Sequence, residues 1–259
     1  MHVIAVANQK GGTAKTTTAA AVGLLLARAG RRVHLVDMDP QASLTHAFGR
    51  RDAEGRLFAA LADGRGLPVE RLGERFTISP SDITLSRGET EFISKPGREH
   101  CLRRALAATP LADDALVIVD CPPSLGVLAV NCLTAARQIL LVVQPGGFEL
   151  QALVHFEQTV ALLREWVNPH LSVAGAVLTN CHSRRSITEQ VAGEVARVYP
   201  LLGTVRMDAQ LLYATTAGNM LALRKSKALD DYDGVRINLE KRLSWPNRPL
   251  PESPASWAG

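Results

Sequence analysis

The sequence predicts a single α/β domain with a mostly parallel, twisted sheet flanked by helices. Short runs rich in valine, isoleucine and leucine alternate along the chain with stretches of helical periodicity, a pattern typical of parallel strands joined by helical crossovers. A glycine-containing loop stands between the first apolar run and the first helical stretch. No polar linker long enough to separate two domains interrupts this pattern.

The composition agrees with a globular fold. Of 259 residues, 46% are hydrophobic and 21% are charged, which is enough apolar material to bury a core. Lys and Arg outnumber Asp and Glu by 29 to 25, an excess that permits an anionic partner without demonstrating one. Apolar stretches fall short of the roughly 20 residues that cross a bilayer, and no signal peptide pattern opens the chain. We therefore expect a cytoplasmic protein.

Five buried strands are expected, each a short run of branched apolar residues. They are His2–Ala7, Arg32–Asp37, Ala115–Asp120, Gln138–Val143 and Ser172–Thr179. Five helices are expected because apolar residues recur at helical spacing and glycine or proline marks the ends. They are Thr16–Ala29, Arg98–Ala108, Gly126–Ala136, Phe148–Val167 and Ile187–Val198.

Two segments are less regular. Residues Gly49–Gly73 are rich in arginine, glycine and aspartate, which favours a surface excursion with one short helix around Leu57–Leu61. We expect the folded domain to extend over residues 1–245. Residues 246–259 hold three prolines after Pro246 and few side chains that could pack, a composition typical of a disordered tail.

The loop at residues 10–17 lies between a strand and a helix, the context of a phosphate-binding loop. Backbone N–H groups of such a loop can converge on phosphate oxygens at the positive end of the helix. Lys15 adds a charge, and Thr16 offers a hydroxyl to Mg²⁺. The strict GxxxxGKS/T pattern is not met, because Gln9 and Ala14 replace its two glycines. An ordinary glycine turn before a helix is the structural alternative.

Carboxylates follow two of the expected strands. Asp37 and Asp39 lie at the end of one strand and Asp120 at the end of another. The carboxyl ends of parallel strands form the edge where an open α/β sheet binds its ligand. The loop and the carboxylates are therefore expected at one edge, which favours a nucleotide site over a plain turn.

These motifs resemble those of the ParA/Soj group of P-loop ATPases with a deviant Walker A motif, within the wider ParA/MinD family. The resemblance extends over roughly residues 2 to 243. Lys10, before the two glycines, matches the signature lysine of the family, and Pro40-Gln41 after Asp39 is typical of ParA/Soj and absent from the MinD branch. The resemblance implies a single-domain P-loop fold and a weak Mg-dependent ATPase with ATP and Mg²⁺ as cofactors.

The resemblance also implies a role for each matching residue. Lys10 and Lys15 would neutralise phosphate oxygens, with Lys10 reaching across an ATP-sandwich homodimer, and Asp39 would orient the attacking water. Thr16 would ligate Mg²⁺, and Asp120 would hold the metal through water. The implied nucleotide-binding residues, with the last as an adenine contact, are Lys10, Gly11, Gly12, Thr13, Ala14, Lys15, Thr16, Thr17 and Asn180.

The implied partners are non-specific DNA, bound in the ATP state, and a ParB-like or cargo-adaptor protein that stimulates hydrolysis. The protein would be nucleoid-associated with ATP and would serve plasmid or chromosome partition or the positioning of another cargo. Phosphate contacts of this kind need no base readout and weaken with salt. The candidate DNA contacts are Arg184, Arg206, Arg224, Lys225 and Lys227, with Arg185 extending the strip.

Two other functions remain open from the sequence. A MinD-like positioning ATPase binds membranes through a C-terminal amphipathic helix, and Val235, Leu239 and Leu243 recur at helical spacing. The same stripe also fits a terminal helix packed on the domain, which is the interpretation we favour. A weakly hydrolysing, nucleotide-dependent scaffold is the second alternative.

A redox role is not expected. The four cysteines form no CxxC pair and lack the glycine-rich setting of a dimer-bridging cluster. We expect buried thiols at Cys101, Cys121, Cys132 and Cys181.

Overall fold

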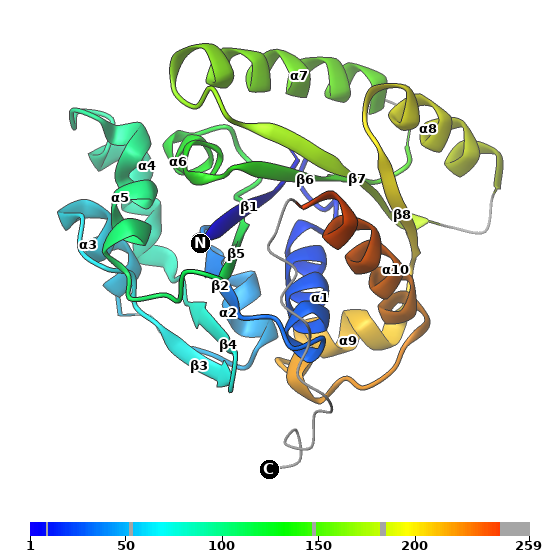
Figure 1. The fold of residues 1–259 in the computed structure, drawn as a ribbon, viewed down its shortest axis with the longest axis horizontal. Coiled ribbons are helices and arrows are strands. Elements are labelled where there is room, and N and C mark those ends of the chain that lie inside the picture. The colour runs from blue at the N-terminus through cyan, green and yellow to red at the C-terminus, as the bar shows by residue number, and fades with distance from the viewer. Residues whose placement is uncertain (9, 52–53, 147–148, 182–184, 244–259) are drawn as a thin grey trace.

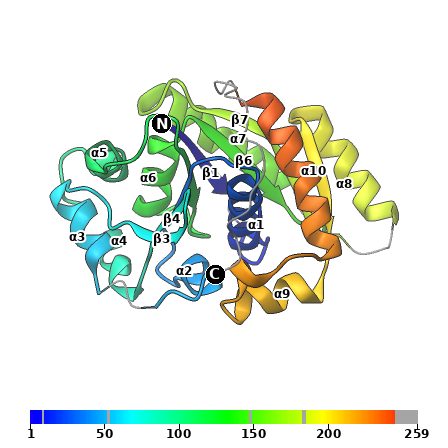
Figure 2. The same cartoon turned by 60° about the horizontal axis from the view of Figure 1, so that its bottom comes forward.

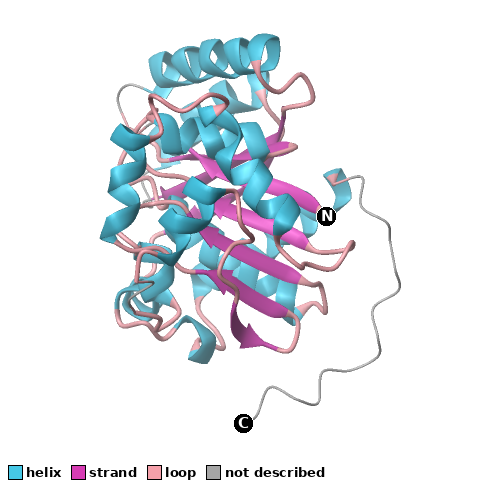
Figure 3. Ribbon diagram, turned by 90° about the vertical axis from the view of Figure 1, so that its left-hand side faces the viewer, coloured by secondary structure: helices cyan, strands magenta, loops and turns pink. Residues whose placement is uncertain are grey.

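The computed structural model describes residues 1–8, 10–51, 54–146, 149–181 and 185–243. The proline-rich residues 246–259, for which a disordered tail is predicted, lie outside the described residues. Within the described ranges, one eight-stranded sheet is covered by helices on both faces (Figures 1 and 3). The predicted α/β class with a mostly parallel sheet is confirmed.

The strands run in the order β3-β4-β2-β5-β1-β6-β7-β8. Every neighbouring pair is parallel except β3 with β4, which is antiparallel and closes one edge. The strands are β1 (His2–Ala7), β2 (Val33–Asp37), β3 (Glu70–Gly73), β4 (Phe76–Ser79), β5 (Leu116–Asp120), β6 (Gln138–Val143), β7 (Ser172–Cys181) and β8 (Leu201–Arg206).

The helices form two layers (Figure 2). One layer contains α1 (Lys15–Arg28), α2 (Ser43–Ala47), α9 (Ala209–Thr216) and α10 (Lys227–Arg242). The other contains α3 (Arg56–Asp63), α5 (Cys101–Ala108), α6 (Val127–Ala135), α7 (Glu149–Trp166) and α8 (Arg185–Val198). Shorter turns are η1 (Ile83–Arg87), α4 (Gly88–Glu91), η2 (Arg98–His100) and η3 (Met220–Ala222).

Each strand divides its side chains between two apolar cores. In β1, Val3 and Ala5 join the core under α5 to α8, whereas Ile4 and Val6 join the core under α1 and α10. Successive side chains of a strand point to opposite faces. Because both faces are covered, the central strands are apolar throughout, which is why they could be found as uninterrupted apolar runs.

The five predicted strands and five predicted helices are present, and their ends differ from the prediction by two residues or fewer, with one exception. The first turn of the helix predicted over Arg98–Ala108 is the separate 3₁₀ turn η2, so α5 begins at Cys101. Strands β3, β4 and β8 were not predicted. They are short or lie at the edges, and the burial of β8 is interrupted along its length. An edge strand lacks the continuous apolar signature of a central one.

The prediction that Gly49–Gly73 is a surface excursion is wrong in part. The short helix around Leu57–Leu61 exists as α3, but Leu57, Phe58 and Leu61 are buried in the main core. The segment ends in β3, which pairs with the sheet. Its many arginines lie on the outer side of elements whose inner side packs.

Helix α10 packs along α1 beneath the same face of the sheet. Val235, Leu239 and Leu243, the stripe that a membrane helix would expose, are at most 5% accessible. The stripe therefore packs on the domain. Within the described ranges, no helix combines the length and apolarity needed to cross a membrane.

One buried hydrogen bond joins α1 to α10. The hydroxyl of Tyr232 lies 2.9 Å from Oγ1 of Thr18, and Tyr232 is 1% exposed. Thr18 Oγ1 also donates to the carbonyl of Ala14 at 2.8 Å. The contact thus ties α10 to the first turn after the glycine-rich loop.

We expect Tyr232→Phe to lower the free energy of unfolding by about 1 kcal/mol, because a buried hydrogen bond is lost while the ring still packs. For a domain of this size the midpoint of thermal unfolding should fall by about 2–4 °C. Tyr213→Phe is the matched control, since Tyr213 is 69% exposed. Equal melting temperatures for the two variants would contradict a stabilising role for the bond.

Candidate functional site

The sheet creates a crevice at the carboxyl end of β1. The connection from β1 passes into α1 on one face, whereas β5 and β6, which flank β1, lead into α6 and α7 on the other face. Such a reversal separates the loops that follow adjacent strands, and open α/β sheets bind ligands there. The loop of residues 10–17 lies at this point.

Contacts from β7 and from within the loop hold it in place. Thr179 Oγ1 donates to the carbonyl of Thr13 at 2.8 Å. The carbonyl of Lys10 accepts hydrogen bonds from Thr13 Oγ1 at 3.3 Å and from Lys15 Nζ at 3.2 Å. These bonds fix the path of the backbone before any ligand is present.

The loop contains a residue in an unfavourable conformation. Ala14 has φ of 65°, and Gly12, two residues earlier, also has a positive φ, of 75°. The left-handed region costs an L-residue about 1–2 kcal/mol relative to a right-handed one. The strict motif places a glycine at position 14, which adopts a positive φ without strain. Ala14 adopts the same region of φ at a cost in stability. The other departure, Gln9, lies outside the described residues.

No side chain caps the N-terminal end of α1. The first N–H groups of a helix have no partner within the helix, and together with the helix dipole they attract anions. The loop and the first turn of α1 therefore present a ready anion-binding end.

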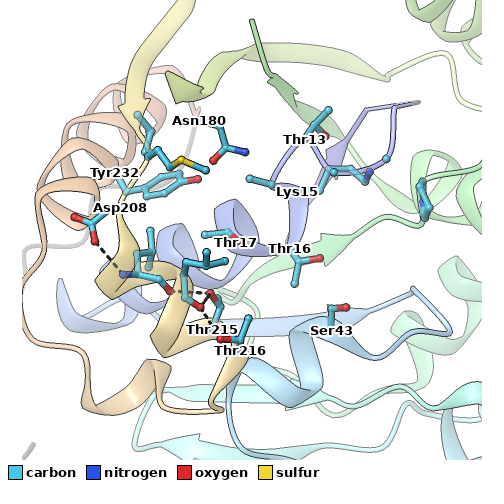
Figure 4. Close-up of a pocket in the computed structure, with 18 of the residues that line it drawn as sticks. Thr13, Lys15, Thr16, Thr17, Ser43, Asn180, Asp208, Thr215, Thr216 and Tyr232 are labelled. Atoms are coloured by element: carbon cyan, nitrogen blue, oxygen red, sulfur yellow. Dashed lines mark hydrogen bonds between the residues drawn. The ribbon is translucent and has the colours of Figure 1, made fainter. Parts of the chain in front are cut away.

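This end opens into a cavity of about 580 Å³. Figure 4 shows Lys15, Thr16 and Thr17 on one side of it, facing Asn180 and Tyr232. The volume suits a ligand of nucleotide size. The cavity is lined by residues 11–17, Asp39, Ser43, His46, Pro123, Asn180, Val205, Arg206, Met207, Asp208, Leu211, Leu212, Thr215, Thr216 and Tyr232.

Two buried carboxylates stand side by side behind the loop. Asp37 and Asp120 are paired in register on β2 and β5, and both are 0% exposed. Asp37 Oδ2 accepts from the Thr45 N–H at 2.8 Å and the Thr45 hydroxyl at 2.7 Å. Among the described residues, neither oxygen of Asp120 accepts a hydrogen bond of normal geometry, although the Thr16 hydroxyl acts on this carboxylate from nearby. A buried carboxylate without partners is costly unless a cation neutralises it.

The electrostatics follow from this burial. Desolvation raises the pKa of Asp37 to about 6, against the hydrogen bonds from Thr45. Desolvation and the adjacent Asp37 raise the pKa of Asp120 well above its usual range, and nearby Thr16 and Lys15 oppose that shift only in part. Burial also lowers the pKa of Lys15, while Asp120 and Asp39 act to raise it.

Asp39 lies at the cavity wall and is half-buried. Its Oδ1 accepts from the N–H of Gln41 at 2.9 Å, and its own N–H donates to Asp37 Oδ1 at 3.2 Å. The backbone turn therefore orients this carboxylate at the edge of the cavity, apart from the buried pair.

The structure brings most of the predicted site together, but not all of it. Residues 11–17, Asp39 and Asn180 line one cavity, and Asp120 lies behind Lys15. Lys10 is exposed and is not part of the lining. Among the predicted DNA contacts, Arg184 falls outside the described residues, as does the side chain of Arg185. Exposed positions away from the cavity are Arg224, Lys225 and Lys227.

Arg206 lies at the rim of the cavity and is paired. Its Nε and Nη2 donate to the two oxygens of Asp231 at 2.7 and 2.8 Å, and its backbone N–H donates to the same carboxylate at 3.1 Å. The ion pair raises the pKa of Arg206 further above its usual value. The predicted DNA contact is thus held in one orientation by a carboxylate.

Sequence reasoning missed how the wall near Arg206 is built. Asp208 accepts from the N–H groups of Gln210, Leu211 and Ala228 at 2.8, 3.0 and 3.2 Å. It therefore joins the N-terminal ends of α9 and α10. The preference of aspartate for helix N-caps could have located the start of α9.

The thiols are largely as expected. Cys101, Cys121 and Cys132 are buried, but Cys181 is only half-buried because it ends β7 at the rim of the sheet. Burial raises the pKa of Cys181 to about 11 and that of Cys132 well above the usual range.

In the part of the chain that the structure describes, no cluster of three or more His, Cys, Asp or Glu side chains could hold a metal. Asp120 could therefore hold a divalent cation only with other ligands, such as the Thr16 hydroxyl and water.

At the crevice of the sheet, a glycine-rich loop joins a central parallel strand to the helix that follows it. This arrangement defines a P-loop nucleotide-binding protein. Comparisons with known proteins agree. A family model described as "AAA domain" matches residues 1–173. The chain is 34% identical to the chromosome partitioning protein ParA of Myxococcus xanthus, over 93% of this chain and 88% of that protein.

Two further relatives are similar over most of their length. The sporulation initiation inhibitor protein Soj of Bacillus subtilis is 36% identical over 76% of this chain and 79% of its own. A solved structure described as cobyrinic acid a,c-diamide synthase of Mycobacterium smegmatis, with bound ATP analogue and magnesium, is 33% identical with a TM-score of 0.77, covering 97% and 98% of the two chains. The chain belongs to the ParA/Soj family of P-loop partition ATPases.

We expect Asp120→Asn to raise the stability of the nucleotide-free protein by on the order of 1 kcal/mol near pH 8. The folded-state pKa of Asp120 is raised, so its charged form destabilises the fold above that pKa, and this cost disappears as the pH falls. The wild type should therefore gain stability as the pH falls from the raised folded-state pKa of Asp120 towards the unfolded-state value of about 4. Asp37, whose pKa is raised to about 6, contributes to this gain in both proteins, so the variant should gain less than the wild type.

Denaturant unfolding of the apo protein at several pH values measures this effect. Asp113→Asn is the matched control, because Asp113 is exposed. An Asp120→Asn protein no more stable than wild type at pH 8 would show that the carboxylate is already compensated.

Proposed function

We propose that this protein is a weak Mg-dependent ATPase of the ParA kind, which forms an ATP-sandwich homodimer and binds DNA non-specifically in that state. A ParB-like or cargo-adaptor protein stimulates hydrolysis and so releases the DNA. The observation that carries the proposal is the buried carboxylate of Asp120, which lies near Lys15 and Thr16 and accepts no hydrogen bond of normal geometry among the described residues. It supplies the negative charge that a nucleotide-bound divalent cation requires.

The residues of the cavity suit ATP. Loop N–H groups and Lys15 bind the phosphates, and Thr16 together with Asp120, through water, holds Mg²⁺. The bound cation would neutralise phosphate charge, which is the main requirement of phosphoryl transfer. Asp39 orients the attacking water from the cavity wall, and Asn180 contacts the adenine. The set contains no strong base beside the phosphate loop, so we infer slow turnover without a partner.

The place of Lys10 fits a role in the dimer. Its side chain is exposed beside the loop, and it contributes no lining to the cavity of its own chain. A lysine in this place can reach a nucleotide bound by a second copy facing it. The proposed ATP-sandwich dimer therefore gives a role to Lys10, whose charge is exposed to solvent in a single subunit.

The proposed DNA contacts begin with Arg206 at the rim of the cavity. Arg206, whose Nε and Nη2 are engaged by Asp231, would meet a phosphate with Nη1, and Arg184, Arg185, Arg224, Lys225 and Lys227 would extend the contact. Contacts to phosphates position a protein on DNA without reading its sequence. Such a dimer would be nucleoid-associated in the cytoplasm, and its cargo would be a plasmid, a chromosome or a protein assembly. The names of the M. xanthus and B. subtilis relatives support the partition setting.

A second candidate function comes from the M. smegmatis neighbour, whose name describes an amide synthase that acts on cobyrinic acid. Such an enzyme would couple ATP hydrolysis to the activation of a carboxylate. Phosphate release measured with cobyrinic acid and a nitrogen donor, and separately with DNA, distinguishes the two. Stimulation by cobyrinic acid alone would favour the synthase.

We expect Asp39→Ala to bind a non-specific DNA duplex with ATP but not with ADP or without nucleotide. The variant removes the residue that orients water, so the ATP state persists. Affinity should fall steeply with salt, because several phosphates are neutralised. Fluorescence anisotropy with a labelled duplex measures binding, and Arg206→Glu in the same background should weaken it at least tenfold while ATP-dependent dimerisation remains. DNA binding that ignores the nucleotide would refute the switch.

We expect Lys10→Ala to keep ATP binding but to lose the ATP-dependent dimer, whereas Lys15→Ala loses ATP binding itself. The difference follows from position, since Lys15 lines the cavity and Lys10 does not. Analytical ultracentrifugation with a non-hydrolysable ATP analogue reports the dimer, and calorimetry reports binding. A Lys10→Ala protein that dimerises as wild type would exclude the cross-subunit role.

A further inference from the structure

A second concentration of positive charge lies far from Arg206. Lys95, Arg98, Arg103 and Arg104 fall within ten residues, in the loop before η2 and on η2 and α5. The three arginines are exposed. In both Figure 1 and Figure 2, α5 lies on the opposite side of the molecule from α9 and α10. We call these four residues the α5 basic surface.

The contacts of this surface orient its cations without neutralising them. Lys95 Nζ donates to the carbonyl of Ala62 at 3.1 Å, and Arg98 Nη1 donates to the carbonyl of Ile93. Arg104 Nη1 donates to the carbonyl of Gly97 at 3.1 Å. Carbonyl oxygens carry no net charge. Among the described residues, no carboxylate forms an ion pair with any of the four.

The backbone is shaped to seat Arg104. Gly97 has φ of +64°, and a Cβ there would stand 3.3 Å from Nη1 of Arg104. A Cβ on Gly64, at the end of α3, would stand 4.0 Å from its Nε. The guanidinium therefore lies between two glycines in a fixed place. A pre-oriented side chain loses less conformational entropy when it binds.

Two of three neighbouring carboxylates form ion pairs with other arginines. Asp63 pairs with Arg65 at 2.6 Å, and Glu91 pairs with Arg87 at 2.7 Å. Glu99 lies 3.4 Å from His100 Nε2. Burial lowers the pKa of His100, Arg103 and Arg104 lower it further, and Glu99 opposes this shift. His100 therefore does not neutralise Glu99, and the local charge is that of four cations beside one carboxylate, which is still positive.

We propose that the α5 basic surface binds phosphates of a nucleic-acid backbone, as a DNA contact separate from Arg206. This inference rests on the proposed function, because it adds a second contact to the same DNA-bound state. Clustered arginines and lysines without carboxylate partners are the electrostatic footprint of backbone binding, and the planar guanidinium matches the geometry of a phosphate. Arg206 is paired with Asp231, whereas no carboxylate among the described residues forms an ion pair with the cations of the α5 basic surface, so this surface adds further charge to that of the Arg206 region.

The test is the salt dependence of DNA binding by the full-length protein with a non-hydrolysable ATP analogue. Each lost phosphate contact lowers the slope of log K against log salt by about 0.9. Arg103→Gln/Arg104→Gln should therefore lower the slope by about 2. Arg137→Gln/Arg197→Gln removes the same charge from exposed positions elsewhere and should leave the slope unchanged.

Arg103→Gln alone keeps the test valid if the Arg104 substitution disturbs folding, since Arg103 is exposed on α5, and it should lower the slope by about 1. If the wild type, Arg103→Gln and Arg103→Gln/Arg104→Gln all bind DNA with the same salt slope, this inference is overturned and the proposed function is left intact. A wild type that binds no DNA in any nucleotide state overturns both. Variants that lose binding to polyglutamate but keep the wild-type DNA slope would assign the surface to an acidic protein, which also overturns the inference.

Discussion

The burial of Asp120 beside Asp37 is the constraint around which the site is arranged. Two carboxylates are paired in register on β2 and β5 without exposure to solvent, and only Asp37 is satisfied by hydrogen bonds. Like charges in a low dielectric repel strongly. Lys15 is the cation that the fold itself supplies nearby. A fold optimised for stability alone would not retain Asp120, so its presence is explained by what the cavity binds.

The phosphate loop shows a similar exchange of stability for function. Its path is fixed by Thr179 and by the Lys10 carbonyl, and it forces Ala14 into the left-handed region. Strained residues persist where the surrounding contacts determine the backbone. The contacts that hold the strained loop also hold the uncapped end of α1 open for an anion. Stability lost at one residue thus preserves the geometry of several N–H groups.

The sequence predicted the centre of the fold better than its edges. β1, β5 and β6 are covered on both faces, so their apolar runs carried the signal, whereas β3 and β8 lie at the edges with mixed burial. For the site, the positions of Lys15, Thr16 and Asp39 followed from strand ends and loop context. The pairing of Arg206 with Asp231 could not be predicted, because 25 residues separate them and only the packing of α10 against β8 brings them together.

That packing also joins the two halves of the proposed activity. Thr18, one turn into α1, contacts both the Ala14 carbonyl of the loop and the Tyr232 hydroxyl of α10. The residue next to Tyr232 is Asp231, which holds Arg206 at the cavity rim. Hydrogen bonds and one peptide link therefore connect the phosphate loop to a predicted DNA contact. Because packed interiors deform little, any shift of α1 would be transmitted to α10, where the orientation of Arg206 is set.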